Sequence, residues 1–340
     1  MVYLFFVVFF FLCFVFSSRK SIIPFAFLIS FSLILFSGLR YNSGVDYQNY
    51  LDLYQSAYFA STEYFYWTLS ILHKSLFNSF PLFVFLVSFF TIVFKIYVLK
   101  KLSVNFFIAV YIYICISYIY VDMGFIRNSI ALMFYMFSVL MLMKGSKKSS
   151  YVLFVVAFFF HHSVFFMFFM FFIDVRGGAK ISRKYLFFLF VFFFLSLLGF
   201  FKFSVFSVLD FFSGNSYVLW KIRFYLDNKG YSSFPVNIYN SRFLFLSLFF
   251  YFFRSKIDNH FFIKIYVVGC CFLLLLGFNV QLYTRLGLYL SFFEILLFSD
   301  LISSCKGRQR EVFIFIVITL YGVLFLRTSY IMNIFEVKFL

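Results

Sequence analysis

The sequence predicts an all-α protein that crosses a membrane many times, and two observations lead to this prediction. Hydrophobic residues make up 64% of the 340 residues and charged residues only 12%, whereas a soluble globular domain is about 45–50% apolar and about 25% charged. The apolar residues also form long runs, and the charged residues cluster in short segments between these runs. This composition excludes a soluble enzyme, a disordered tail and a disulfide scaffold.

The apolar runs set the expected number of spans, because a helix needs about 20 mostly apolar residues to cross about 30 Å of hydrocarbon. We expect about ten transmembrane helices within one membrane domain, 1–340, at residues 1–16, 22–39, 81–99, 104–121, 126–143, 185–202, 237–253, 259–279, 286–302 and 311–327. The first run has no basic residue ahead of it and no small-residue cleavage site, and it is followed by Arg19 and Lys20. We therefore expect a retained anchor there and not a cleaved signal peptide.

Two further segments differ from simple spans. Residues 63–80 are aromatic but carry Glu63, His73 and Lys74, so we expect an interfacial helix that lies along the membrane. Residues 150–173 have basic residues on both flanks, and basic loops prefer the cytoplasm. If both flanks are cytoplasmic, this segment turns back as a re-entrant or half-span hairpin, with His161, His162 and Ser163 at its turn.

The net charge of +17 comes from 29 basic and 12 acidic residues. With the hairpin in place, most basic clusters fall in cytoplasmic loops, and the outer face holds two hydrophilic loops, 40–62 and 203–236. The charge thus serves as an orientation signal, and we expect no nucleic-acid partner. The 67 phenylalanines are expected to be a lipid-compatible filler.

Several polar groups that are far apart in the sequence share the outer face in this topology. They are Arg40 and Asp46 in the run GLRYNSGVDYQNY, Arg127 and Arg285 near two helix starts, and His161 at the hairpin turn. An isolated arginine at a helix end is often only an interface anchor, and a single histidine in an apolar run is often only packed. The carboxylate of Glu294, deep in an apolar run, is either functional and paired or protonated and passive.

Arginines beside a carboxylate or an imidazole suit the transfer of a group from a pyrophosphate. Guanidinium groups bind phosphate bidentately and stay charged at any relevant pH, and a carboxylate or imidazole can take a proton from an attacking hydroxyl. The sequence has no DxD pair, no Cys/His ligand spacing and no phosphate-binding glycine loop. We therefore expect no metal and no other cofactor, with arginine stabilising the leaving group.

Four segments of this sequence resemble, in order, the motifs of the EpsG family, a branch of the Wzy-type O-antigen and exopolysaccharide polymerases. The most specific is G-L-R-Y-x-x-G-x-D-Y-x-x-Y, over Gly38–Tyr50. The others are F-I-R-N-S-I-A at Phe125–Ala131, F-H-x-S at Phe160–Ser163 and R-L-G-L-Y at Arg285–Tyr289.

The resemblance implies an enzyme that joins undecaprenyl-pyrophosphate-linked oligosaccharide repeats on the periplasmic face of the bacterial inner membrane. Such a glycosyltransferase needs the lipid-linked oligosaccharide as donor and acceptor, with membrane lipid and a chain-length regulator as further partners. Pyrophosphate and glycan binding is assigned to Arg40, Arg127, Arg285, Arg223 and Tyr47. Asp46 or His161 is the expected base: Asp46 has the better motif, and His161 has the more suitable unperturbed pKa. The alternatives are an O-antigen ligase and a flippase or other transporter for the same lipid-linked unit.

Overall fold

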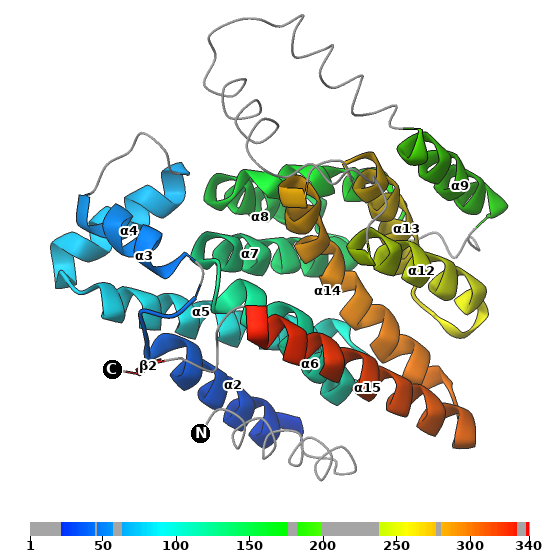
Figure 1. Ribbon diagram of the computed structural model, residues 1–340, viewed down its shortest axis with the longest axis horizontal. Helices are drawn as coiled ribbons and strands as arrows, with labels where there is room; N and C mark the ends of the chain where they lie inside the picture. The colour runs from blue at the N-terminus through cyan, green and yellow to red at the C-terminus, as the bar shows by residue number, and fades with distance from the viewer. Residues whose placement is uncertain are drawn as a thin grey trace, which may run out of the picture. The chain divides into compact units, whose positions relative to one another are not determined.

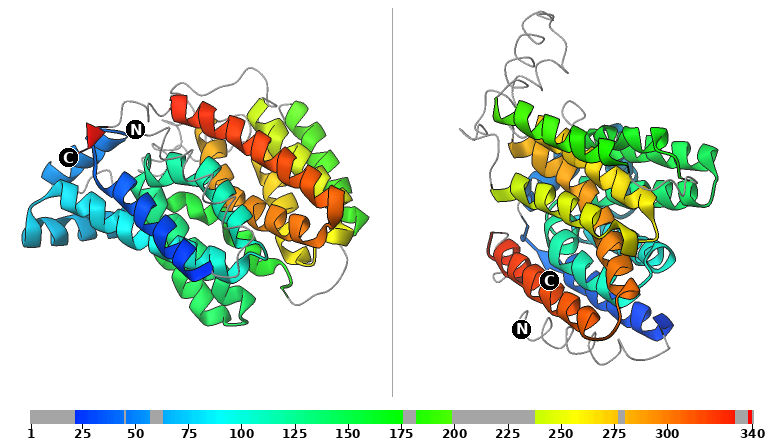
Figure 2. Two further views of the ribbon diagram at one scale, coloured as in Figure 1. Left: turned by 90° about the horizontal axis from the view of Figure 1, so that it is seen from below. Right: turned by 90° about the vertical axis from the view of Figure 1, so that its right-hand side faces the viewer.

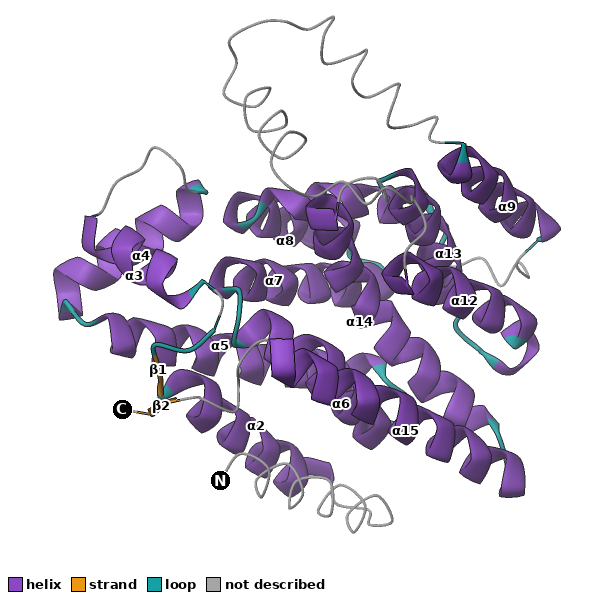
Figure 3. Ribbon diagram, viewed as in Figure 1, coloured by secondary structure: helices purple, strands orange, loops and turns teal. Residues whose placement is uncertain are grey.

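The computed structural model describes residues 22–44, 46–56, 63–175, 182–198, 238–276, 280–331 and 338–339, and nearly all of them are helical (Figure 3). The chain forms two compact units, one from described residues within 1–164 and 298–340 and the other from those within 165–297 (Figure 1). The expected span 1–16 and the expected loop 203–236, which includes Arg223, lie outside the described residues. The prediction of one membrane domain over 1–340 stays a prediction.

The first unit contains helices at most of the predicted apolar runs. They are α2 (Ile22–Gly38), α5 (Phe80–Leu102), α6 (Phe106–Tyr113) continued by the π-helix η1 (Ile114–Asp122), α7 (Ile126–Met143), α8 (Lys147–Phe160) and α15 (Gly307–Ile331). The same unit holds α3 (Tyr47–Ser56), α4 (Tyr64–Phe77) and a two-residue strand, β1 (Arg40–Tyr41), which pairs antiparallel with β2 (Lys338–Phe339). The sequence did not predict this strand pair.

The second unit contains η2 from Phe165 onward, α9 (Arg183–Leu197), α12 (Ile238–Phe252), η3 (Arg254–Lys256) and α13 (His260–Leu275). Helix α14 (Val280–Ser304) begins in this unit and ends in the first. Within the unit, α13 contacts both α9 and α12 (Figure 2).

Among the described residues, four helices are both long enough and apolar enough to cross a membrane: Phe80–Leu102, Ile126–Met143, Tyr283–Ser304 and Gly307–Tyr330. Five shorter apolar helices cover Ile23–Gly38, Phe106–Asp122, His162–Phe172, Ser241–Phe252 and His260–Leu275. The protein is therefore an all-α membrane protein. The number of about ten spans stays a prediction.

Helix α3 lies within the segment 40–62, whose place as an outer loop stays a prediction. Residues Tyr47, Tyr50 and Tyr54 are buried and follow the helical spacing i, i+3, i+7. The helix begins directly after Asp46, whose side chain accepts a 3.2 Å hydrogen bond from the Asn49 side chain. The sequence did not predict this helix because its residues are mostly polar, whereas the other helices were predicted from apolar runs. The predicted helix over 63–80 forms as α4, and its interfacial position stays a prediction.

The segment 150–173 is broken into two short arms, as the expected hairpin requires. Helix α8 ends at Phe160, His161 has an extended backbone (φ −160°, ψ 117°), and the 3-10 helix η2 (His162–Phe172) follows. At about 1.5 Å per α-helical residue and about 2.0 Å per 3-10 residue, each arm is shorter than the roughly 30 Å of hydrocarbon. The break at His161 is thus observed, and the re-entrant course stays a prediction.

Helices of the first unit pack closely against one another. Helix α7 packs along α8, and α2 packs along α5 (Figure 1, Figure 2). The hydroxyls of Ser138 and Ser150 lie 2.9 Å apart between α7 and α8, and each is 2.8 Å from the other residue's carbonyl. A Cβ on Gly38 would lie 2.7 Å from the Phe85 ring, so the end of α2 approaches α5 closely.

Candidate functional site

Glu63 joins two of the residues that the sequence placed in the site. Its carboxylate forms an ion pair with Arg127 through Oε2 and accepts a 2.8 Å hydrogen bond from Nδ1 of His161 through Oε1. Glu63 lies at the N-cap of α4, Arg127 in the first turn of α7, and His161 at the C-cap of α8. Three elements of the first unit therefore meet at one carboxylate.

Burial and charge fix the ionisation of this cluster. Burial alone would raise the pKa of Glu63, but the hydrogen bond from His161 and the charge of Arg127 outweigh burial and hold that pKa well below its ordinary value of 4.5. Because an ionised carboxylate only accepts hydrogen bonds, Nδ1 of His161 carries the proton. In the neutral imidazole, Nε2 then carries the lone pair that a base needs.

Arg127 contacts a carboxylate and two aromatic rings, and its side chain remains partly exposed. Its guanidinium lies 5.4 Å from the ring centre of Tyr50 and 5.9 Å from that of Tyr66, an arrangement that stabilises a cation. The side chain of Arg127 remains 23% exposed, whereas that of Glu63 is 3% exposed. The Arg127 side chain is therefore the member of this ion pair that solvent reaches, whereas Glu63 is enclosed.

The described residues 39–44, which follow α2 and include β1, form a loop that seats Arg40 against the turn between η1 and α7; we call it the signature loop. Asn42 and Gly44 have positive φ angles of 46° and 101°, which favour short side chains and glycine. A Cβ on Gly44 would lie 2.4 Å from the Met123 carbonyl oxygen, so the loop backbone touches this turn. Tyr47 packs edge-on against Phe80 at 5.3 Å and closes the loop on α5.

Arg40 is almost completely buried at the centre of this loop. It is 2% exposed, and its Nη1 donates a 2.8 Å hydrogen bond to the backbone carbonyl of Asp122. Burial lowers the pKa of Arg40 from 12.5 to about 10, which leaves the guanidinium charged at neutral pH. Its Nε is buried, and none of the described residues bonds it. Arg40 thus carries a buried charge whose hydrogen bonds are incompletely used.

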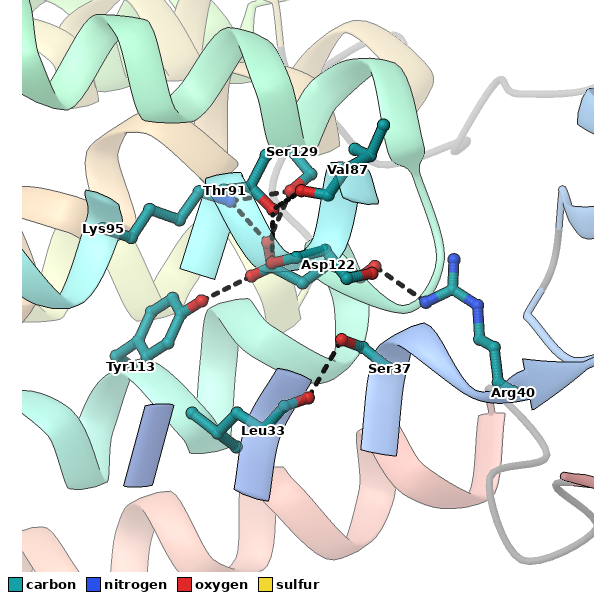
Figure 4. Close-up of polar contacts among 10 residues, drawn as sticks. Leu33, Ser37, Arg40, Val87, Thr91, Lys95, Tyr113, Asp122 and Ser129 are labelled. Carbon is teal, nitrogen blue, oxygen red and sulfur yellow. Dashed lines mark hydrogen bonds and ion pairs between the residues drawn. The ribbon is translucent and has the colours of Figure 1, made fainter. Parts of the chain in front are cut away.

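The carboxylate of Asp122 faces away from Arg40, into a second buried cluster (Figure 4). Lys95 of α5 donates to its Oδ1 at 2.6 Å, and Tyr113 of α6 donates to its Oδ2 at 2.7 Å. Ser129 of α7 also donates to Oδ1, and it accepts a 2.9 Å hydrogen bond from Lys95. Lys95 is fully buried and Asp122 is 4% exposed.

The two site arginines of the first unit lie on either side of one turn. Arg40 binds the carbonyl of Asp122, and Arg127 lies five residues further along the chain, in the first turn of α7. The Arg127 guanidinium also lies 5.4 Å from the ring centre of Tyr50 on α3. The structure therefore brings Arg40, Tyr47, Arg127 and His161 to the same end of the first unit.

Two other predicted site residues, Asp46 and Arg285, are also among the described residues. Asp46 is half-buried directly ahead of α3, and its carboxylate bonds Asn49. Arg285 lies near the start of α14, in the second unit. The predicted roles of these two residues, and that of Arg223, stay predictions.

Within the described ranges, no group of three or more His, Cys, Asp or Glu side chains can hold a metal ion. Metal independence also stays a prediction.

Glu294 resolves one alternative that the sequence left open. It is fully buried, and Nη2 of Arg242 donates to both of its oxygens at 2.6 and 2.7 Å. The hydroxyl of Tyr266 adds a 3.3 Å hydrogen bond to Oε2. Glu294 is therefore paired, and its contacts link α12, α13 and α14 in the second unit.

Glu63 and the Lys95–Asp122 pair were not predicted as site residues, although the sequence carried a signal for each. Glu63 is an acidic residue next to an otherwise aromatic helix, and Lys95 is a charge inside an apolar run. Charges in such positions are costly and usually have a partner. The partners of Glu63 lie 64 and 98 positions away, too far for any local pattern to reveal them.

Comparison with known proteins shows the family of this chain. Neither a curated protein nor a solved structure matches the chain. The family model of the EpsG family matches residues 23–339, nearly the whole chain. The chain therefore belongs to the EpsG family, a family of Wzy-like polysaccharide polymerases.

Proposed function

We propose that this protein polymerises undecaprenyl-pyrophosphate-linked oligosaccharide repeats on the periplasmic face of the inner membrane, making O antigen or a related surface polysaccharide. The observation that carries this proposal is the bridging of Arg127 and His161 by Glu63. It places a cation suited to a phosphate next to an imidazole suited to a hydroxyl proton.

The reaction assigned to the site is a glycosyl transfer. The growing glycan sits on undecaprenyl pyrophosphate, and a hydroxyl of the next lipid-linked repeat attacks its anomeric carbon. The new glycosidic bond forms as the bond to the pyrophosphate oxygen breaks. His161 takes the hydroxyl proton through Nε2, and the pyrophosphate leaves with the electron pair of the broken bond.

The arginines act on the leaving group. Arg127 supplies a partly exposed cationic side chain, and Arg40 supplies a buried charge behind the same turn. Fixed positive charge at the developing phosphate anion lowers the barrier without reorganisation of solvent. Arg285 and Arg223 complete the proposed set of arginines, and Tyr47 supports the glycan side of the site.

His161 is favoured over Asp46 as the base by its surroundings. The imidazole is oriented by an ionised carboxylate that also holds Arg127, which is the arrangement that prepares a histidine for proton transfer. Asp46 instead lies at the start of α3, with its carboxylate bonded to Asn49. The proposed base is therefore His161 and not Asp46.

A gel of surface polysaccharide tests the proposal. Cells that lack the gene are complemented with the wild-type protein, Arg127→Ala or Arg254→Ala; Arg254 is a control arginine that lies over Tyr251 at 4.4 Å in the second unit. We expect the wild type and Arg254→Ala to give a full ladder, and Arg127→Ala to give only lipopolysaccharide capped with one repeat. Loss of every repeat would indicate a ligase or a transporter instead.

A further inference from the structure

The Lys95–Asp122 pair is a feature that the proposed mechanism does not use. Both residues are buried, Lys95 on α5 and Asp122 at the end of η1. A buried ion pair adds little net stability, because the cost of removing two charges from water offsets their attraction. Such charges inside a membrane domain commonly have a function.

Asp122 is the residue that connects this pair to Arg40. Its backbone carbonyl accepts from Arg40, while its carboxylate accepts from Lys95, Tyr113 and Ser129 (Figure 4). The carboxylate also attracts the Arg40 guanidinium electrostatically. Without another cation nearby, this carboxylate would be the counter-ion of Arg40.

Lys95 prevents that pairing by cancelling the charge of Asp122. The 2.6 Å contact between Nζ and Oδ1 makes a neutral pair, and no carboxylate of the described residues is bonded to the positive charge of Arg40. A guanidinium in this condition attracts an external anion more strongly, because charge interactions are strengthened in a low-dielectric interior.

We propose that Lys95 neutralises Asp122 and thereby keeps Arg40 available for the pyrophosphate of the lipid-linked donor. Lys95 is thus a positioning residue that acts through Asp122 and Arg40 without touching the ligand. This inference rests on the proposed function, in which Arg40 binds the pyrophosphate.

The test measures the affinity of the purified full-length protein for undecaprenyl pyrophosphate. Lys95→Gln keeps a polar side chain but removes the charge, and should weaken binding by about tenfold, the scale of one interaction with a charged group. Lys95→Gln/Asp122→Asn removes both charges and should bind within about twofold of the wild type. Lys264→Gln, which removes another buried lysine, serves as the control and should bind like the wild type.

The order of the affinities separates a role in charge from a role in folding. A purely structural pair predicts that Asp122→Asn weakens binding as much as Lys95→Gln does. The charge role predicts that Asp122→Asn binds at least as tightly as the wild type, since Arg40 then has no competing carboxylate. It also predicts that Lys95→Gln has no further effect when Arg40→Ala is already present.

Two variants that each remove a single hydrogen bond test the proposal even if Lys95→Gln does not fold. Tyr113→Phe removes one hydrogen bond from Asp122 without changing any charge, and Tyr111→Phe removes one of equal length, to the Ile318 carbonyl. Both should bind undecaprenyl pyrophosphate like the wild type. A tenfold loss in Tyr113→Phe alone would overturn the charge role in favour of a purely geometric one.

Failure of the proposed function and failure of the role of Lys95 give different results. If Arg40→Ala binds like the wild type, the assignment of Arg40 in the proposed function is wrong. If Arg40→Ala binds weakly and Lys95→Gln binds like the wild type, the proposed function stands and the role of Lys95 is wrong.

Discussion

Nδ1 of His161 donates a 2.8 Å hydrogen bond to Oε1 of Glu63, a residue 98 positions earlier in the chain. The same carboxylate holds Arg127 through its other oxygen. A single buried anion therefore sets both the tautomer of the histidine and the position of the arginine. This relationship makes Glu63 the residue on which the proposed chemistry depends most.

Replacing Glu63 tests its effect on the base. Glu63→Gln should lower the rate of polymerisation by about a hundredfold, because the imidazole loses its orienting carboxylate. Glu63→Asp keeps a carboxylate and should retain more activity than Glu63→Gln. A folded Glu63→Gln variant with wild-type activity would contradict a role of this carboxylate in orienting His161.

Replacing Arg127 tests recognition of the leaving group. Arg127→Lys keeps the charge but loses the planar fork that binds phosphate and the contact with the rings of Tyr50 and Tyr66. We expect the KM for the lipid-linked donor to rise and kcat to fall, each by about tenfold. Arg127→Ala should show a larger loss than Arg127→Lys. Equal activity of the two variants would mean that the charge of Arg127 plays no part.

Acid should weaken the folded state through Glu63. Its pKa is lowered in the folded protein, below the ordinary 4.5, so its stabilisation is present above that value and is lost as the pH falls towards the folded pKa. The difference in Tm between the wild type and Glu63→Gln should therefore be largest at neutral pH and shrink below about pH 4.5. A difference that grows on acidification would give the opposite sign and contradict the ion pair.

A substitution at Gly44 tests whether the backbone of the signature loop lies against the turn at Met123. Gly44→Ala places a Cβ 2.4 Å from the Met123 carbonyl at a φ of 101°, whereas Gly307→Ala meets nothing within 4 Å at a φ of 53°. Gly307→Ala should cost about 1 kcal/mol of unfolding free energy, and Gly44→Ala about 3 kcal/mol, because it adds a clash to the strain. Equal losses in thermal unfolding would show that the loop does not seat on the turn.

The apolar helices were predictable because their signal is local. The run 126–143 matches α7 from Ile126 to Met143, since an apolar stretch is followed by the basic segment at Lys144. The break at His161 was also predicted, from the basic flanks of 150–173. The α3 helix was missed because its buried face consists of tyrosines at helical spacing within a polar sequence.

The pairing of charges could not be predicted, because it depends on which helix ends meet. The sequence placed Arg127 and His161 in one site but treated Glu63 only as a charge that argued against a span. It likewise placed Lys95 inside a span and Asp122 outside, and did not relate them. Both pairs join segments that the fold alone brings together, so distance in the sequence concealed them.

The most direct test of the account is polymerisation by the purified protein in liposomes with one defined undecaprenyl-pyrophosphate-linked repeat. The wild type and Arg254→Ala should give a ladder of products and release undecaprenyl pyrophosphate in equal number to the bonds formed. Glu63→Gln, Arg127→Ala and His161→Gln, each shown to fold by its Tm, should give little or none of either. A full ladder from all three variants would contradict the assignment of this cluster as the site of glycosyl transfer.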